Sequence, residues 1–270
     1  MGVFSSTWVG VRQTRVFLRL RGDTLARLNF LTKKAVTLMT RTLVTTLRAL
    51  LVMSPAGANE RIEQRMAEII PDITPDSIRP SGLSNLYEVR YGTDIFYVSE
   101  DGRFLLQGNL IDLESRENLT ERTKRGVRAE IFAAIPDSEL TVYAPEGEPR
   151  YTLNVFTDPN CPYCRQFHQD LDKYLEAGVK VRYFMYPVLG RNSPDIMRDI
   201  WCADSRTDAM DRAKSDRAVA SSDCPTPVDE HLALGRELGI TGTPASITGN
   251  GQLISGFRPV VDTMVILQSE

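Results

Sequence analysis

A Cys-x-x-Cys pair, Cys161-Pro162-Tyr163-Cys164, follows a short apolar run at residues 151–156 and opens a helical pattern. A strand that ends in a tight turn and delivers two cysteines to the start of a helix limits the folds open to the chain. Proline suits the first helical position, because its φ angle is fixed near the helical value and its missing N–H is not needed there. Cys161 is therefore expected at a helix N-terminus, where the partial positive charge favours the thiolate and lowers the cysteine pKa.

The two cysteines have the spacing of a redox pair. Cys161, nearer the helix end and the surface, is expected to attack a disulfide, and Cys164, one turn further in and more buried, to resolve the mixed disulfide. Pro162 and Tyr163 lie between them and are expected to tune the thiolate pKa and the reduction potential. The main alternative is a zinc site, but a closed zinc site needs four ligands, usually from two close pairs. No second Cys-x-x-Cys follows, so we expect no metal and no other cofactor.

A basic leader precedes an acidic body. Residues 1–58 hold nine Lys or Arg and one acid, a net charge of +8, which leaves −11 on residues 59–270. This pattern indicates targeting and argues against nucleic-acid binding, because an acidic body repels phosphate backbones. Met39 is a plausible start, residues 43–53 form an apolar run of secretory length, and Ala56-Gly57-Ala58 has the small residues of a cleavage site. We predict that residues 1–58 are an export leader; the alternative is a disordered or amphipathic basic tail.

Export changes how the four cysteines are interpreted, because an even number in an exported chain favours disulfides. Cys202 and Cys224 look structural, and closing the loop between them would stabilise the fold by ~3 kcal/mol in the chain-entropy model. The alternative is two independent buried thiols. His168 and His231 are interpreted as helix-surface or packing residues, and Asp158 as a turn-forming residue.

Residues 59–116 form a small first unit. The periodicity predicts a helix over 60–70 and strands over 86–91, 95–98 and 103–113. So small a unit buries little surface, so pairing with a second copy would help it. Gly108 within the third run marks either a bulge or a sheet edge that pairs with another subunit. The charged run at 117–135 is interpreted as a semi-rigid, solvated helical linker.

From residue 140 strands and helices alternate. We predict a strand over 151–156, a helix over 162–176, a strand over 179–185, a helix-rich insertion over 194–237, strands over 245–248 and 252–254, and a helix over 260–268. This is the order of a thioredoxin-like domain with helices inserted in its middle. Thr243-Pro244 precedes a strand and suggests a cis proline, in which case Thr243 can offer its backbone to an extended peptide.

Four stretches in order carry a family resemblance: residues 98–108, 155–158, 200–203 and 233–245. Over residues 60–268 the chain resembles the DsbC/DsbG family of periplasmic disulfide isomerases. The resemblance implies a two-domain α+β fold. Its parts would be an N-terminal cystatin-like dimerisation domain at 59–116, a helical linker at 117–136 and a thioredoxin-like catalytic domain at 137–270.

The resemblance also implies a function and its partners. The protein would be a V-shaped, periplasmic homodimer that reshuffles wrong disulfides in misoxidised exported clients, with chaperone activity in a shared cleft. Cys161 and Cys164 would be the active pair, supported by Pro162, Tyr163, Thr243 and a cis Pro244. Cys202–Cys224 would be a structural disulfide, and a DsbD-type membrane reductant would keep the active pair reduced.

One departure keeps other functions open. The usual dipeptide of the DsbC branch is Gly-Tyr, whereas Pro162-Tyr163 is the pattern of the DsbG branch and of glutaredoxins. The DsbG branch lacks the second cysteine pair, so the chain is closer to the DsbC branch. The alternatives are a DsbG-like reductant of sulfenylated cysteines, a DsbA-like thiol oxidase and a holdase chaperone whose cysteines are secondary.

Overall fold

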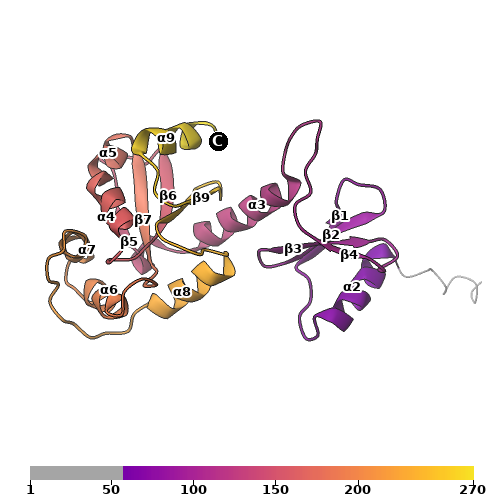
Figure 1. The fold of residues 1–270 in the computed structure, drawn as a ribbon, viewed down its shortest axis with the longest axis horizontal. Coiled ribbons are helices and arrows are strands. Elements are labelled where there is room, and N and C mark those ends of the chain that lie inside the picture. Colours follow the sequence, from indigo (N-terminus) through magenta and orange to yellow (C-terminus); the bar gives the residue numbers. More distant parts are fainter. Residues whose placement is uncertain (1–56) are drawn as a thin grey trace, which may run out of the picture. The chain divides into compact units, whose positions relative to one another are not determined.

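The computed structural model describes residues 57–270 (Figure 1). The predicted start at Met39, the apolar run 43–53 and the beginning of the cleavage site at Ala56 lie outside the described residues. Within residues 57–270 no helix has the length and apolar character needed to cross a bilayer.

The first part of the described chain is a helix packed on an antiparallel sheet. The strand order is β1-β2-β3-β4. Helix α2 lies on this sheet because Ile62 and Met66, one turn apart, share a core with Val89 and Val98. The bounds are α2 Ala58–Ile69, β1 Ser77–Pro80, β2 Leu86–Tyr91, β3 Asp94–Ser99 and β4 Leu105–Gln107.

Two features of this sheet differ from the sequence prediction. Strand β1 was not predicted, because it has only four residues and ends in Pro80, which fits an edge strand but gives no alternating signal. The predicted strand over 103–113 is wrong beyond Gln107. Gly108 has a φ of 154°, a conformation that favours glycine, and the chain leaves the sheet there.

Helix α3, Leu119–Ala134, begins at Asn118, whose side chain accepts a hydrogen bond from the Glu121 amide. The interpretation of its basic run as a solvated face is wrong at Arg128, which is buried and donates to the Gly251 carbonyl at 2.6 Å. Phe132, one turn on, belongs to the core of the thioredoxin-like domain. The C-terminal half of α3 is therefore a packed element.

The thioredoxin-like domain is built on a five-stranded sheet with the order β5-β7-β6-β8-β9. Strands β6 and β7 are parallel and the other pairs are antiparallel. Along β6, Leu153 and Val155 face one core and Phe156 faces the other, as the alternation of a strand requires. The bounds are β5 Thr141–Tyr143, β6 Tyr151–Thr157, β7 Val179–Met185, β8 Ala245–Thr248 and β9 Leu253–Ser255.

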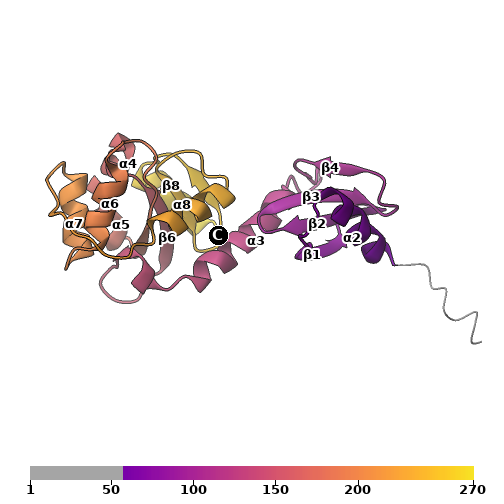
Figure 2. The same cartoon turned by 90° about the horizontal axis from the view of Figure 1, so that it is seen from below.

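Helices cover both faces of this sheet (Figures 1 and 2). One core joins the strands to α4 Pro162–Gln169, α5 Leu171–Glu176, α6 Ser193–Trp201, α7 Arg206–Lys214 and α9 Val260–Gln268. The other core joins them to the end of α3 and to the segment that follows α8 Val228–Glu237. Both faces of β6 are covered, so the residues that follow it start from a rigid base.

The helix predicted over 162–176 is two helices that meet at Asp170. The Asp170 amide donates to the Phe167 carbonyl, an i to i−3 bond that tightens the turn and ends α4. The predicted insertion consists of α6, α7 and α8. Cys202 at the end of α6 is disulfide-bonded to Cys224, which lies between α7 and α8.

Candidate active site

The two free cysteines lie where β6 passes into α4. Cys161 is the N-cap residue of α4 and Pro162 occupies the first turn. The Cys161 sulfur accepts a hydrogen bond from the Cys164 amide at 3.3 Å. This amide belongs to the group of N–H donors that a helix leaves free at its start, so the helix end stabilises negative charge on Cys161.

The two thiols differ strongly in acidity. The hydrogen bond from the Cys164 thiol, together with Thr243 and the amides of Cys164 and Tyr163, lowers the pKa of Cys161 to about 5 despite burial. Burial, and then the hydrogen bond to Cys161, raises the pKa of Cys164 well above its usual value. At neutral pH Cys161 is therefore a thiolate and Cys164 a thiol.

Exposure does not distinguish the two thiols, contrary to the sequence expectation. Cys161 is 1% exposed and Cys164 is 0% exposed. The loop before β8 covers Cys161, because the Thr243 carbonyl in this loop lies 3.2 Å from the Cys161 sulfur. Pro162 is exposed, and so is Tyr163, at 61%. The two thiols therefore differ in acidity and not in exposure.

The Thr243–Pro244 peptide bond is cis. It places the Thr243 carbonyl and side chain against Cys161. The Thr243 hydroxyl is buried and makes no hydrogen bond of ordinary geometry within the described residues. It is also one of the groups that lower the pKa of Cys161, so it is a donor available to the thiolate.

Asp158 has a larger role than the predicted turn. Its side chain is fully buried and accepts from the Asn160 amide at 2.7 Å, as a turn-forming residue does. It also accepts from the amides of Val188 and Leu189 at 2.7 and 2.9 Å and from the Ser193 hydroxyl at 2.9 Å. One carboxylate thus ties the cysteine turn to the loop after β7.

Both histidines are packing residues, and the helix-surface alternative is wrong. His168 contacts the Tyr183 hydroxyl with Nδ1 and the Asp211 carboxylate with Nε2, each at 3.0 Å. The His231 ring accepts a hydrogen bond from the Met185 amide at 3.1 Å. Burial lowers the pKa of both rings, that of His231 to about 4. Both imidazoles are therefore neutral at pH 7.

Lys214, in the last turn of α7, was missed by the sequence reasoning. It is 4% exposed, and its ammonium group donates to the Thr157 hydroxyl at 2.6 Å and to the Asp158 carbonyl at 2.9 Å. A lysine near a helix end carries no sequence signal for burial, because such residues are usually solvated. The thiol pair and this lysine are brought together only by the packing of α7 on α4.

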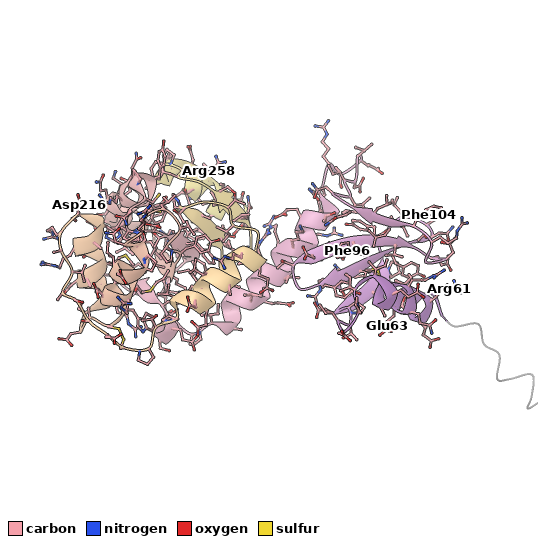
Figure 3. The ribbon with its side chains drawn as sticks, turned by 60° about the horizontal axis from the view of Figure 1, so that its bottom comes forward. Arg61, Glu63, Phe96, Phe104, Asp216 and Arg258 are labelled. Atoms are coloured by element: carbon pink, nitrogen blue, oxygen red, sulfur yellow. A yellow bond between two sulfur atoms is a disulfide. The ribbon has the colours of Figure 1, made fainter. Side chains whose placement is uncertain are left out.

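A second contact holds α7 to the cysteine turn. Arg165, on α4, donates to the Pro159 carbonyl at 2.9 Å and pairs with Asp216 at 3.1 Å. Asp216, just beyond α7, lies at the periphery of the domain in Figure 3. Its side chain is highly exposed, so the pair serves mainly to orient the guanidinium group.

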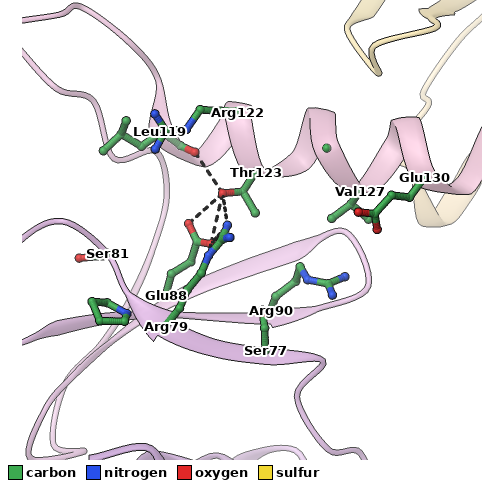
Figure 4. A pocket seen from close by; sticks show the side chains of 12 residues that line it. Ser77, Arg79, Ser81, Glu88, Arg90, Leu119, Arg122, Thr123, Val127 and Glu130 are labelled. Carbon is green, nitrogen blue, oxygen red and sulfur yellow. Dashed lines mark hydrogen bonds and ion pairs between the residues drawn. The ribbon is translucent and has the colours of Figure 1, made fainter.

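A pocket of about 400 Å³ lies elsewhere, between strands β1 and β2 and helix α3 (Figure 4). Two of its charged groups are paired with each other. Arg79 and Glu88 form an ion pair at 2.6 Å, and the Thr123 hydroxyl contacts both side chains. No cysteine lines this pocket, and residues 57–270 contain no cluster of three side chains suited to a metal ion. The thiol pair is therefore the candidate active site.

Comparison with known proteins agrees with this geometry. Residues 53–121 match the family model described as the disulfide bond isomerase protein N-terminal domain, and residues 136–263 match a thioredoxin-like domain. The chain is 30% identical over 200 residues to the thiol:disulfide interchange protein DsbC of Escherichia coli K12, covering 73% of this chain and 82% of that protein.

Two further similarities were found. A probable thiol:disulfide interchange protein DsbC of Bordetella pertussis is 34% identical over 204 residues, which are 75% of this chain and 70% of that protein. The crystal structure of a disulfide interchange protein from Neisseria gonorrhoeae has 27% identity and a TM-score of 0.45, covering 50% of this chain and 97% of that one. The two DsbC relatives and the two matched domains, together with a thiol pair of opposed acidity, establish that the chain belongs to the DsbC family of thiol:disulfide interchange proteins and is a protein disulfide isomerase.

Proposed function

We propose that the protein reshuffles wrong disulfides in exported client proteins, and that Cys161 begins each reaction. The observation that carries this proposal is the acidity difference within the motif, because hydrogen bonds lower the pKa of Cys161 to about 5 despite burial, whereas burial and the hydrogen bond to Cys161 raise that of Cys164. A thiolate is the nucleophile in thiol–disulfide exchange.

The reaction proceeds through a mixed disulfide. The Cys161 thiolate attacks one sulfur of the client disulfide, a Cys161–client bond forms, and the other client sulfur leaves as a thiolate. A client thiolate that attacks the mixed disulfide then gives a rearranged client and regenerates Cys161. Attack by Cys164 instead releases a reduced client and leaves a Cys161–Cys164 disulfide.

The surroundings of Cys161 suit an unfolded client. Tyr163, Val188 and Leu189 are large apolar side chains that remain exposed. Asp158 accepts hydrogen bonds from the amides of Val188 and Leu189, which fixes that loop beside the cysteine turn. Exposed apolar groups around a thiolate favour polypeptides that have not buried their own cores, which is also the basis of the proposed chaperone activity.

A second copy of the chain is the proposed partner of strand β4. This strand is at the edge of its sheet, so one row of its backbone groups is free to pair. Leu105 and Leu106 in this strand and Phe104 just before it are exposed, and Phe104 projects from the sheet in Figure 3. A dimer built on this edge would cover these groups and place two thioredoxin-like domains in one molecule.

The proposed location is the periplasm. The basic leader with its apolar run and the Cys202–Cys224 disulfide both fit export to an oxidising compartment. In such a compartment a low-pKa dithiol needs a source of electrons to stay reduced. We therefore propose a DsbD-type membrane reductant as the partner that reduces the Cys161–Cys164 disulfide.

The proposal is tested with residues 59–270 and a small secreted protein whose disulfides have been scrambled. The reduced enzyme is expected to restore the native disulfides of the client, and Cys161→Ser to lose this activity. Cys164→Ser is expected to accumulate a covalent enzyme–client complex, because the thiol that would release a trapped client is gone. Mass spectrometry of the digested complex identifies the joined residues.

The control is Cys202→Ser with Cys224→Ser, which removes a disulfide but leaves the thiol pair intact. This variant is expected to form the complex through the same residue, Cys161. Activity that survives in Cys161→Ser, or a complex joined through Cys164 in the wild-type enzyme, would refute the proposed roles.

A further inference from the structure

Lys214 is a buried charge that the exchange chemistry described so far does not use. Its ammonium group donates to the Thr157 hydroxyl and to the Asp158 carbonyl, and both of these acceptors are neutral. Within the described residues no carboxylate forms an ion pair with it. A buried ammonium group without an acidic partner is unfavourable, so its retention calls for a functional explanation.

Thr157 connects Lys214 to the buried thiol. It is the last residue of β6 and is fully buried. Its hydroxyl accepts from the Lys214 ammonium at 2.6 Å and is one of the groups that lower the pKa of the Cys164 thiol. A hydroxyl group both donates and accepts, so Thr157 can pass a proton between the thiol on one side and the amine on the other.

The release step needs such a proton acceptor. Cys164 attacks the mixed disulfide only as a thiolate, and burial raises the pKa of its thiol. Two other candidates are occupied. The Asp158 carboxylate accepts four hydrogen bonds from other groups. The His168 ring contacts Tyr183 and Asp211 through its two nitrogens.

We propose that Lys214 accepts the proton of Cys164 through the Thr157 hydroxyl when Cys164 attacks the mixed disulfide, and returns it when the enzyme disulfide is reduced. This inference rests on the proposed roles of Cys161 and Cys164. Lys214 acts through Thr157 and does not touch the reacting sulfurs.

The step balances without any added reagent. The Cys164 proton passes to the Thr157 oxygen, and the Thr157 hydroxyl proton passes to the neutral Lys214 amine. The Cys164 thiolate forms a bond to the Cys161 sulfur, the Cys161–client bond breaks, and the client sulfur leaves with the electron pair. The enzyme dithiol is oxidised and the client disulfide is reduced, by two electrons. On reduction of the enzyme disulfide, Cys164 leaves as a thiolate and takes the proton back.

The acidity of Lys214 suits this exchange. Burial lowers the pKa of its ammonium group to about 8, against the opposing effect of Cys164, Asp158 and Cys161, and with a further small decrease from Arg165. Tyr183 from β7 also faces Lys214, with the ammonium nitrogen 6.0 Å from its ring centre. The neutral amine is therefore a minority species at pH 7, and its fraction rises with pH and levels off above pH 8.

Neighbouring groups do not titrate in this window. Burial lowers the pKa of His168 below its ordinary 6.5, and burial raises that of Tyr183 far above 10. The release rate is accordingly expected to rise through about pH 8 because of Lys214. Below that pH the mixed disulfide lives longer, which gives client thiols time to rearrange before release.

The test separates attack from release. The reduced enzyme is mixed with oxidised glutathione, quenched with acid at successive times, and analysed by intact mass. Attack by Cys161 appears as the glutathione adduct, and release appears as its conversion to the Cys161–Cys164 disulfide. Both rates are measured between pH 6 and pH 10. If no adduct forms, the proposed role of Cys161 is refuted. If the adduct forms but decays at the same rate with and without the Lys214 amine, only the present inference is refuted.

Lys214→Met keeps the length of the side chain and removes the amine. Release at pH 7 is expected to slow at least about tenfold and to lose its inflection near pH 8. This is less than the ~10²–10⁴-fold typical of general acid–base catalysis, because only a minority of Lys214 is neutral at pH 7. Thr157→Val keeps the shape of the side chain and is expected to do the same, since it removes only the connecting hydroxyl. Lys173→Met, at an exposed lysine of α5, is the matched control and should leave the pH profile unchanged.

Lys214→Arg separates proton transfer from charge alone. Arginine retains the positive charge but does not accept a proton at these pH values, so release is expected to remain slow and without the inflection. Wild-type release in Lys214→Met and Thr157→Val would overturn the inference. Recovery of both the rate and the pH profile in Lys214→Arg would also overturn it, because a fixed charge would then be sufficient.

Discussion

The Cys161 sulfur is held between the start of helix α4 and the loop before β8. On the helix side it accepts a hydrogen bond from the Cys164 amide at 3.3 Å. On the loop side it faces Thr243, whose carbonyl is 3.2 Å away and whose hydroxyl lacks a hydrogen-bond partner of ordinary geometry within the described residues. The low pKa of Cys161 therefore has three sources, which are the hydrogen bond from the Cys164 thiol, the Thr243 side chain and the amides of the helix terminus.

Thr243→Val is expected to raise the pKa of Cys161 by about one to two units, since a hydrogen bond to a charged group is worth ~1.5–3 kcal/mol. The thiolate absorbance of the reduced enzyme, followed against pH, measures this value. Thr243→Ser retains the hydroxyl and is expected to keep the pKa near 5. An unchanged pKa in Thr243→Val would show that the helix terminus and the Cys164 thiol determine the acidity without Thr243.

His231 gives a pH dependence of stability. Burial lowers the pKa of its ring to about 4 in the folded protein, whereas an unfolded histidine titrates near 6.5. As the pH falls from 6.5 to 4 the unfolded state gains a proton that the folded state does not bind. Folding stability therefore decreases over this window as the pH falls.

His231→Gln retains an acceptor for the Met185 amide and removes the titration. Between pH 7 and pH 4.5 the wild type is expected to lose about 2 kcal/mol more unfolding free energy than this variant. Urea unfolding at the two pH values measures the difference. Equal losses in the two proteins would mean that the ring is protonated in the folded state.

At the scale of elements, Gly235 explains the close packing of α8 on Tyr186, the residue that follows β7. A Cβ atom there would lie 2.3 Å from the Tyr186 ring, whereas at Gly126 in α3 it would meet nothing within 4 Å. Both glycines are in helix interiors, so alanine improves helix propensity by up to ~1 kcal/mol at each. The two sites form a matched pair in which only the packing differs.

Gly235→Ala is expected to lower the unfolding free energy by about 1–2 kcal/mol, because the overpacking exceeds the gain in propensity. Gly126→Ala is expected to leave it unchanged or raise it by up to ~1 kcal/mol. Urea unfolding of both variants tests the comparison. Equal stabilisation by the two substitutions would mean that Tyr186 moves aside freely.

Most elements of the thioredoxin-like domain could be predicted from the sequence. The predicted bounds of β7, β8 and α9 match the structure, because apolar periodicity and flanking glycine or proline residues mark those ends. Strand β1 and the break at Asp170 were not predictable in this way. The first is too short for a pattern, and the second depends on hydrogen bonding within one turn.

The cysteines of the candidate site could be found from the sequence, but several of its supporting residues could not. The spacing of Cys161 and Cys164 carries a local signal, and the cis bond before Pro244 was implied by the family resemblance. No local sequence signal marks Lys214 or the four hydrogen bonds of Asp158, because both depend on which helix and which loop pack against the turn. Charged residues at such positions look solvated in a sequence and become buried only through tertiary structure.

At the scale of the whole molecule, the proposed dimer depends on strand β4. Leu106→Lys places a charge on the exposed edge and is expected to weaken the dimer at least about tenfold, since desolvating a lysine opposes association. Light scattering of the full mature chain across a dilution series measures its mass. Val265→Lys, at an exposed apolar position on α9, is the control and should leave the mass unchanged. A dimer that is equally stable in both variants would place the interface elsewhere.

The proposed isomerase works only with its thiol pair in the reduced form. In the proposed reaction a reduced Cys161 attacks wrong disulfides, whereas an oxidised pair would donate a disulfide, as a DsbA-like oxidase does. The opposed acidities of Cys161 and Cys164 describe the reduced state, which only a supply of electrons maintains in an oxidising compartment. The redox state of the pair in cells therefore distinguishes the isomerase from the oxidase.

The most direct measurement is to trap the thiols of the exported protein with an alkylating reagent added straight to cells, and to map the labels by mass spectrometry. The account predicts alkylated Cys161 and Cys164 together with an intact Cys202–Cys224 disulfide. An active pair recovered mainly as a Cys161–Cys164 disulfide would contradict the isomerase and indicate a thiol oxidase.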